Sequence, residues 1–400
     1  LRRKEVDTGG ILPYAVFRKY TRQRRNCEVK KLGFGLMRLP LVNAEDQKSI
    51  DMDMLREMVD LFLSEGFTYF DTAYMYHEYR SEIAVREALV SRHKRESFTL
   101  ASKLPIVYLK EEADNEKYFN EQMEKCGVDF FDYYMLHDIN RLSYEKAEKF
   151  NSFSFIQQMK KEGKIRRAGI SYHDDAELLY QILTAHPELD FVQLQVNYLD
   201  WNHPAIQSRK CCETAAAHGK PIIVMEPVKG GTLADLPEEA EALLRSYAPD
   251  ASAASWAIRF AASQKNVEMV LSGMSCTEQL RDNLQYMREF QPMEEEEYAL
   301  LEKVVEMINE SVSIPCTGCR YCVEGCPVSI PIPEYFALYN AEQQALNKGF
   351  STQRTYYDNL IHTYSRASEC IGCGSCEAAC PQHLKVAQYM KSVAEAFERD

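Results

Sequence analysis

Short apolar runs alternate with amphipathic stretches from about residue 31 to residue 290. Apolar residues recur at helical spacing between the runs, most clearly over 51–66, where Gly66 marks the end of the helix. Eight alternating β/α units predict a parallel TIM (β/α)8 barrel. A doubly wound sheet is the alternative, but no GxGxxG follows the first run. The eight predicted strands are 31–39, 68–73, 98–104, 129–137, 165–171, 191–197, 221–227 and 267–274.

The pattern changes after residue 290. An acidic helical segment leads directly into a cysteine-rich stretch, and the residues between and after the two cysteine groups are again typical of helices. We therefore predict three parts with a boundary near 290–312: an N-terminal extension over 1–30, a barrel over 31–291 and a small, mostly helical domain over 292–400.

Charge and composition exclude several classes of protein. The net charge of −13 argues against nucleic acid as the main partner, because phosphate contacts need a basic surface. No apolar run reaches the roughly 18 residues that a membrane span needs. The extension over 1–30 is basic but has no apolar segment behind it, so we expect no signal peptide.

Eight of the 13 cysteines form two copies of one motif, CTGCRYCVEGCP over 316–327 and CIGCGSCEAACP over 370–381. Both have the spacing C-x2-C-x2-C-x3-C-P that holds a [4Fe–4S] cluster. Zinc sites and free thiols are the alternatives, but zinc more often uses two pairs of cysteines. The motifs therefore predict two [4Fe–4S] clusters, and reduced thiols favour a cytoplasmic location. No ligand spacing connects the other five cysteines, Cys27, Cys126, Cys211, Cys212 and Cys276.

Polar residues follow consecutive predicted strands of the barrel. Asp71 ends the second strand and Tyr76 lies just beyond it, while Lys103 and His137 end the third and the fourth. Catalytic groups of parallel barrels lie at the C-terminal ends of the strands. We therefore expect these four side chains to converge at one rim.

This set resembles the aldo-keto reductase family over roughly residues 31–290. The segment FDTAYMYHEYRSE places Asp71 and Tyr76 five residues apart, ASK supplies Lys103, and MLHD supplies His137. The resemblance implies that the barrel interconverts a carbonyl and an alcohol with a nicotinamide cofactor. Tyr76 would then be the proton donor, with its pKa lowered by Lys103, which Asp71 holds in place. His137 would orient the substrate oxygen.

The same resemblance assigns the nicotinamide contacts. Ser171 and Gln193 match positions that hold the carboxamide, and Asp282 and Asn283 match the adenine contacts. The sequence departs from the family at Met225, where many members stack a tyrosine on the nicotinamide.

Two further departures concern the choice of cofactor. Gly273 and Gln279 stand where NADPH-preferring members carry Lys and Arg, and a 2′-phosphate needs such cations. This favours NADH slightly over NADPH, although Arg281 counts in the other direction. A flavin at the same rim is a second alternative.

The cysteine motifs lie 44 residues apart, counted from Cys326 to Cys370. This long separation resembles the α-helical ferredoxin domains of multi-subunit redox enzymes. In two-cluster ferredoxins the fourth cysteine of each motif reaches across to the other cluster. The resemblance therefore implies two ligand sets, Cys316, Cys319 and Cys322 with Cys380, and Cys370, Cys373 and Cys376 with Cys326.

Together these features predict an oxidoreductase that acts on a small carbonyl or alcohol and exchanges single electrons through its clusters, with a ferredoxin or another redox protein as partner. A flavin, a radical-tolerant substrate or that partner would connect one-electron and two-electron chemistry. One alternative is an electron-transfer or docking protein in which the barrel is only a scaffold. Another is that the clusters have a purely structural role.

Overall fold

The structure is a computed structural model that describes residues 30–310, 313–345 and 351–398. The predicted extension, apart from Lys30, and Cys27 within it lie outside the described residues.

Eight parallel strands close into a barrel in the order β1 to β8, each paired with its neighbours in sequence and β8 paired with β1. This confirms the predicted TIM-barrel fold. Every predicted strand is present, and the first is shorter than predicted because the chain leaves the sheet after Gly35. The strands are β1 (Leu32–Gly35), β2 (Tyr69–Asp71), β3 (Thr99–Leu104), β4 (Phe131–Ile139), β5 (Ile165–Tyr172), β6 (Phe191–Gln195), β7 (Ile222–Met225) and β8 (Val267–Gly273).

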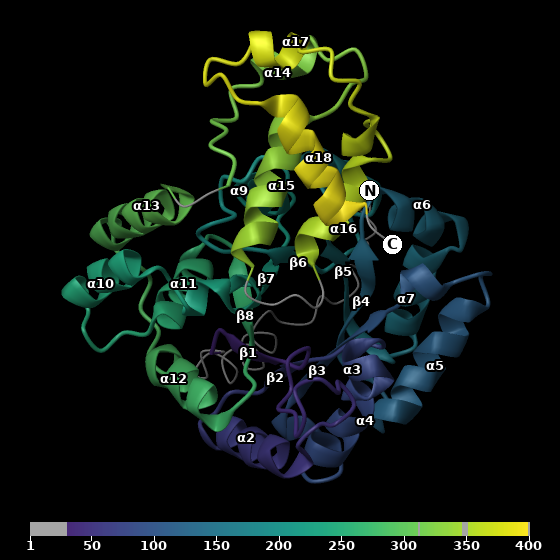
Figure 1. Cartoon of the computed structure of the whole chain (residues 1–400). Helices are drawn as coiled ribbons and strands as arrows, with labels where there is room; N and C mark the ends of the chain where they lie inside the picture. The colour runs from purple at the N-terminus through teal and green to yellow at the C-terminus, as the bar shows by residue number, and fades with distance from the viewer. Residues whose placement is uncertain (1–29, 311–312, 346–350, 399–400) are drawn as a thin grey trace, which may run out of the picture.

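Helices surround the barrel and form the C-terminal part (Figure 1). The helix predicted over 51–66 is α2, and its N-cap is Asp51, whose carboxylate accepts the backbone N–H of Met54 at 3.0 Å. The helices around the barrel are α2 (Met52–Ser64), α3 (Tyr76–Tyr79), α4 (Ser81–Val85), α5 (Asp114–Cys126), α6 (Arg141–Lys149), α7 (Ser152–Lys161), α8 (Ala176–Ala185), α9 (Ser208–Ala217), α10 (Glu238–Tyr247), α11 (Ala253–Ser263), α12 (Thr277–Met287) and α13 (Glu295–Glu310). Those of the C-terminal part are α14 (Tyr321–Glu324), α15 (Ile332–Gln344), α16 (Thr352–Leu360), α17 (Ser375–Ala378) and α18 (Val386–Phe397).

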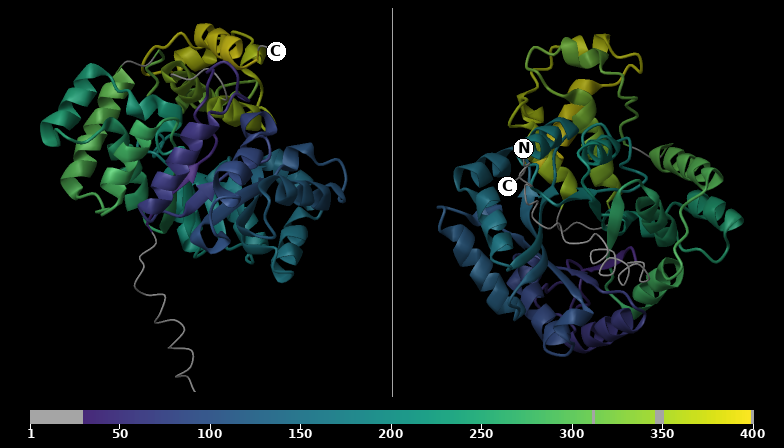
Figure 2. Two further views of the ribbon diagram at one scale, coloured as in Figure 1. Left: turned by 90° about the horizontal axis from the view of Figure 1, so that it is seen from below. Right: turned by 180° about the vertical axis from the view of Figure 1, so that it is seen from behind.

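The helical C-terminal part has its own apolar core, which includes Tyr335, Phe336 and Tyr357. Ala205 and Ile206, from the loop between β6 and α9, are buried in this same core. In Figure 1, α15, α16 and α18 stand beside the ends of β5 to β7, and α14 and α17 lie at the end farthest from the barrel; Figure 2 shows the same arrangement from behind. The C-terminal part is therefore docked on one sector of the barrel rim through shared apolar packing.

Helix α13 packs against the barrel: its residues Leu301, Val304 and Ile308 belong to the core formed by strands and outer helices. The predicted division of the chain near residue 291 stays a prediction. In the described part of the chain, no helix has the length and apolar character required to cross a membrane.

The inside of the barrel is tightly filled, and Gly169 of β5 is the clearest sign of this. A Cβ atom on Gly169 would lie 2.6 Å from the carbonyl oxygen of Phe191 and 2.7 Å from its ring. Such distances are shorter than van der Waals contact, so only glycine lets β5 and β6 pair at this point.

Gly169→Ala is therefore expected to lower the free energy of unfolding of the barrel by about 3 kcal/mol, since the strand must shift to accept the methyl group. Of the two tryptophans of the chain, Trp256 is buried in the barrel core and Trp201 packs against it, so denaturant unfolding followed by their fluorescence reports on this part. The control is Gly163→Ala, where φ is +79° but no atom lies within 4 Å, and it is expected to cost about 1 kcal/mol. Equal costs for both variants would contradict the packing argument.

Candidate active site and cysteine cavities

Strand alternation carries four polar side chains to the mouth of the barrel. Successive side chains of a strand point to opposite faces, so residues two apart share the interior. The interior apolar cluster contains Tyr69, Ala101, Met135 and Phe191. Two residues further along the same strands stand Asp71, Lys103, His137 and Gln193. Tyr76 joins them from the first turn after β2.

Lys103 is the centre of this group, with no exposed surface. Its ammonium forms an ion pair with Asp71, donates to the carbonyl oxygen of Thr72 at 2.8 Å and donates to the hydroxyl of Tyr76 at 3.3 Å. Burial alone would lower the pKa of Lys103, but the interactions with Asp71, and then with Tyr76, outweigh it and raise the pKa above the usual value. Lys103 therefore stays charged.

Tyr76 differs from the prediction. Burial raises its pKa, and the ammonium of Lys103 offsets only part of this increase. The prediction that the pKa of Tyr76 is lowered is therefore wrong for this geometry. Burial of the phenolate raises the pKa by more than the charge of Lys103 lowers it. The phenol remains protonated well above neutral pH, as a proton donor must.

His137 lies edge-on to Tyr76, with ring centroids 5.9 Å apart. Burial, and then the nearby Lys103 and His173, hold the pKa of His137 well below its usual value, so its imidazole is neutral. Among the described residues, its buried Nδ1 atom has no hydrogen-bond partner. A buried polar atom without a partner is costly, and a ligand that reaches this site would relieve the cost.

The residues matched to the nicotinamide contacts lie in two places. Ser171 and Gln193 are buried at the same mouth, where the amide of Gln193 donates to Asp71 at 3.3 Å. Asp282 and Asn283 lie on α12, where Asp282 accepts from Ser252 at 2.7 Å and Asn283 donates to Ser272 at 2.9 Å. The first pair thus joins the group around Lys103, and the second stands beside the end of β8.

Arg38 was not singled out from the sequence. Its side chain lies over two glycines: a Cβ on Gly273 would be 3.2 Å from it, and one on Gly230 would be 3.3 Å from its guanidinium. Its ion-pair partner is Glu226, at 3.6 Å. The aliphatic part of Arg38 therefore covers Gly273, and its guanidinium lies near Gly230 and Glu226. Local spacing could not reveal this, because Arg38 and Gly273 are 235 positions apart.

His173 was also missed. It follows β5 two residues after Ser171, so strand alternation could have indicated that it faces the mouth. Its Nε2 atom lies 3.2 Å from the hydroxyl of Ser171, and its Nδ1 is buried without a partner among the described residues. Burial lowers its pKa despite the opposing charges of Asp138 and Glu226.

A second buried ion pair supports the rim: Lys229, after β7, binds Asp200, after β6. Asp200 also accepts from the side-chain amides of Gln195 and Asn197, at 2.8 Å each. These contacts connect the loop after β6, which reaches the core of the C-terminal part, to the loop after β7, which carries Glu226. No motif in the sequence marks it.

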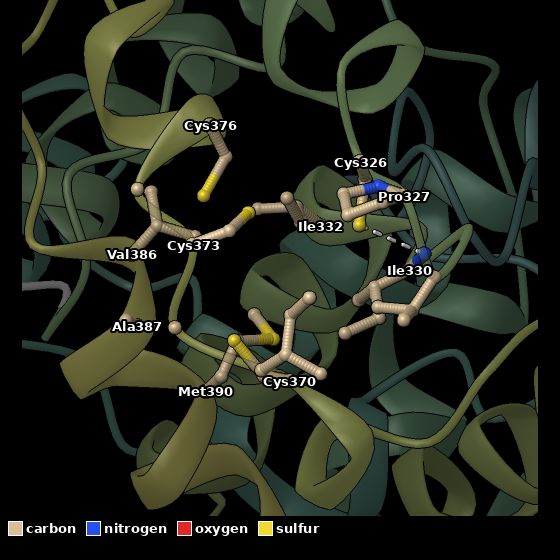
Figure 3. A pocket seen from close by; sticks show the side chains of 14 residues that line it. Cys326, Pro327, Ile330, Ile332, Cys370, Cys373, Cys376, Val386, Ala387 and Met390 are labelled. Atoms are coloured by element: carbon tan, nitrogen blue, oxygen red, sulfur yellow. Dashed lines mark hydrogen bonds between the residues drawn. The ribbon is translucent and has the colours of Figure 1, made fainter.

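The cysteines of the two motifs line two cavities of similar size. The first is lined by Cys370, Cys373 and Cys376 together with Cys326, and Figure 3 shows Cys326 across the cavity from Cys373 and Cys376. The sulfur of Cys326 accepts the backbone N–H of Ile330 at 3.4 Å. The second is lined by Cys316, Cys319, Cys322 and Cys380. Each cavity thus gathers three cysteines of one motif and the fourth of the other.

The lining of the first cavity fits an iron–sulfur cluster. Apart from cysteine, apolar residues and glycines line the first cavity, which suits a cluster held by thiolates alone. Over the described residues, no three His, Cys, Asp or Glu side chains converge closely enough to hold a single metal ion. A four-iron cluster does not require such convergence, because each thiolate binds a separate iron.

Comparison with known proteins agrees with both parts. The sequence profile of the aldo/keto reductase family matches residues 31–306, and that of a 4Fe-4S dicluster domain matches residues 315–384. No curated relative matches the chain.

Solved structures share the barrel fold. An aldo-keto reductase of Bacillus halodurans in its holo form is 24% identical over 68% of this chain and 91% of its own, with a TM-score of 0.55. A thermostable aldo-keto reductase in complex with the inhibitor epalrestat is 21% identical over 70% and 97%, with a TM-score of 0.56. An aldo/keto reductase of Klebsiella pneumoniae in complex with NADP and acetate is 19% identical over 69% and 91%, with a TM-score of 0.54. The barrel and the matched profile lead to one conclusion: this chain belongs to the aldo/keto reductase family, and a 4Fe-4S dicluster domain follows its barrel.

Proposed function

We propose that the protein is an oxidoreductase that interconverts a carbonyl compound and an alcohol at the barrel mouth and exchanges single electrons through two [4Fe–4S] clusters. The observation that carries the first half is the contact of the buried Lys103 ammonium with both Asp71 and the hydroxyl of Tyr76. A barrel that served only as a scaffold would have no need to bury a charged lysine beside a tyrosine hydroxyl.

Each residue of the group has a role that follows from its chemistry. Tyr76 holds the proton that the carbonyl oxygen receives, and Lys103 stabilises the phenolate left behind. Asp71 keeps Lys103 charged and in position. The neutral imidazole of His137 hydrogen-bonds the substrate oxygen and so fixes its orientation toward Tyr76.

A nicotinamide cofactor would supply the hydride. Ser171 and Gln193 would hold its carboxamide, and Asp282 and Asn283 its adenine. The buried, unpartnered Nδ1 atoms at the mouth are consistent with a site that receives a polar ligand. A flavin at the same rim stays the alternative cofactor.

The choice between NADH and NADPH involves Arg38. Gly273 and Gln279 favour NADH, since neither side chain can bind a 2′-phosphate ionically. Arg38 lies against Gly273 and offers a guanidinium in the same region. We propose that Arg38 restores the affinity for NADPH that these two positions remove.

The eight motif cysteines would hold the clusters in crossed sets, three from one motif and the fourth from the other. Cys319 and Cys373 are exposed, as are Tyr321 and Ile371 nearby. Clusters held at this outer end would exchange electrons with a ferredoxin or a similar redox protein. Thiolate ligation also supports a cytoplasmic location.

The roles assigned to Asp71, Tyr76, Lys103 and His137 are tested by Tyr76→Phe, which removes the proton donor and leaves the ring. Carbonyl reduction is expected to fall by at least about 100-fold, whereas the affinity for the nicotinamide cofactor, measured by fluorescence titration, stays the same. Tyr74→Phe is the matched control, because the Tyr74 hydroxyl donates to Glu121 on α5 at 3.1 Å, outside the group around Lys103. Unchanged turnover in Tyr76→Phe would contradict the proposal and favour the electron-transfer alternative.

Two double variants test the crossed ligand sets. Cys316→Ala with Cys380→Ala removes two ligands of one crossed set, so about four of about eight irons per chain should remain after anaerobic purification. Cys316→Ala with Cys326→Ala damages both crossed sets and should leave almost no iron. If each motif instead held its own cluster, the two results would be exchanged. Two zinc ions and no colour in the unaltered protein would contradict cluster binding altogether.

The role of Arg38 is tested by Arg38→Ala. Loss of a charge-assisted phosphate contact is expected to weaken NADPH binding by at least about tenfold and to leave NADH binding within about twofold. Arg245→Ala, on the outer surface of α10, removes the same charge away from the mouth and is the control. Equal weakening of both cofactors would show that Arg38 contacts a group they share and not the 2′-phosphate.

A further inference from the structure

Strands β2 and β3 stop pairing two residues before Lys103. The last pair in their register is Asp71 with Ala101, and the backbone N–H of Thr72 donates to the carbonyl oxygen of Ala101 at 3.0 Å. Residues two apart on a strand turn their backbone N–H and C=O groups toward the same neighbouring strand. The carbonyl group of Lys103 therefore points toward β2 at a level that β2 does not reach. Since Lys103 has no exposed surface, this carbonyl oxygen needs a donor from outside the sheet.

The side-chain amide of Gln122, on α5, supplies that donor and donates to the carbonyl oxygen of Lys103 at 3.1 Å. The same NH2 group donates to the hydroxyl of Ser102 at 2.9 Å and to the carboxyl group of Glu82. The amide oxygen accepts the hydroxyl of Tyr134 at 2.6 Å. None of these side chains has exposed surface. The amide is therefore held at both ends, with its NH2 group directed at β3.

The residue before Glu82 holds the end of β2. Ser81, at the start of α4, is fully buried, and its hydroxyl lies 2.8 Å from the hydroxyl of Thr72. The backbone carbonyl of Thr72 accepts from the ammonium of Lys103. Two consecutive residues of α4 therefore support both strand ends, Ser81 directly at β2 and Glu82 through Gln122 at β3.

The contacts of Gln122 lie on the outer side of the barrel wall. Ser102 and Lys103 are consecutive residues of β3, so Lys103 points toward the mouth and Ser102 toward the outer helices. Gln122 thus reaches the mouth only through the backbone of β3. The contact most sensitive to this backbone is that of the ammonium with the hydroxyl of Tyr76, because 3.3 Å is at the long limit of a hydrogen bond.

We infer that Gln122 is a positioning residue for Lys103. Its amide, held by Glu82, keeps the end of β3 at the level where the ammonium reaches the hydroxyl of Tyr76. Without this bond the ion pair with Asp71 would persist, since two buried charges attract strongly, and the contact with Tyr76 would lengthen. The phenolate would lose the cation that stabilises it, and proton transfer would slow. This inference rests on the proposed carbonyl reduction and adds to it a residue outside the site.

Gln122→Met tests this role, because it removes the amide and keeps an unbranched side chain of similar volume. With the cluster-loaded protein, NAD(P)H and 4-nitrobenzaldehyde as the probe, kcat is expected to fall by at least about tenfold, with KM for the cofactor within about twofold. Proton transfer from Tyr76 then limits the rate more strongly, so the ratio of kcat in H2O to kcat in D2O should rise by about 1.5-fold or more. An unchanged kcat and isotope ratio would overturn the inference.

Asn115→Leu is the matched control, because it also removes a buried side-chain amide from α5. The Asn115 amide donates to the carbonyl oxygen of Phe150 at 2.7 Å and accepts the hydroxyl of Ser152 at 2.7 Å, at the start of α7. This variant should lower the free energy of unfolding as Gln122→Met does and leave the isotope ratio unchanged. Equal losses of kcat and equal isotope ratios in both variants would show that Gln122 acts only through general stability, and would overturn the positioning role.

Two variants of Glu82 test how the amide is held. Glu82→Gln keeps an oxygen that accepts from Gln122, so kcat should stay within about threefold of the unaltered value. Glu82→Leu removes that acceptor, and kcat should fall toward the value of Gln122→Met with the same rise in the isotope ratio. An equal fall in both variants of Glu82 would remove this residue from the assignment.

Unfolding measurements separate this inference from the proposed reaction. Gln122→Met is also made in a protein with Asp71→Asn and Lys103→Met, which has no buried ion pair to position. There it should change the unfolding constant by at least about fivefold less than in the unaltered protein, whereas Asn115→Leu should have equal effects in both. If this difference is found but no carbonyl compound is reduced, the proposed reaction fails and the positioning role stands. If Gln122→Met has equal effects in both proteins, the role fails whatever the turnover.

Discussion

The fully buried ammonium of Lys103 is the constraint around which the barrel mouth is organised. A buried charge that has no contact with water needs an opposite charge and hydrogen bonds. Removing the opposite charge would leave a buried, unpaired charge and destabilise the fold strongly. Asp71 supplies the charge, and the Thr72 carbonyl and the Tyr76 hydroxyl supply the remaining acceptors. Because Asp71 ends β2, Thr72 and Tyr76 follow it, and Lys103 belongs to β3, these contacts also fix how two neighbouring strand ends meet. The same charge adds to the effect of burial in keeping His137 neutral.

The C-terminal part depends on the barrel in a comparable way. Ala205 and Ile206, in the loop after β6, are buried in the apolar core of the C-terminal part. The ion pair of Asp200 with Lys229 holds the base of this loop. In the other direction, Asn359 reaches the backbone of His173. Each part therefore completes a buried region of the other. Such reciprocal packing favours one fixed arrangement over two domains that move independently.

The short helices α14 and α17, which carry Cys322 and Cys376, lie at the end of the helical part farthest from the barrel (Figure 1). The core of the helical part is rich in aromatic rings, with the Tyr335 and Tyr357 centroids 4.7 Å apart and those of Tyr357 and Phe397 4.9 Å apart. The outer end leaves Cys319 and Cys373 accessible, while the inner end contacts the rim beside β5. The same domain thus presents one face to solvent and uses the other to shape the site.

Local sequence patterns were sufficient for the barrel and for the two cysteine motifs. The alternation of apolar runs gave all eight strands, and the spacing of FDTAYMY placed Asp71 and Tyr76 correctly relative to β2, because these features depend on residues near one another in the chain. The pKa of Tyr76 was predicted with the wrong sign, because burial depends on every element around the phenol and not on Lys103 alone. Arg38 against Gly273, Asn359 on His173 and Asp200 with Lys229 were not predicted at all. These contacts join segments far apart in sequence, and they exist only because closure of the barrel and docking of the helical part bring those segments together. The sequence by itself determined the elements and the ligand types, and the tertiary structure decided which side chains share a site.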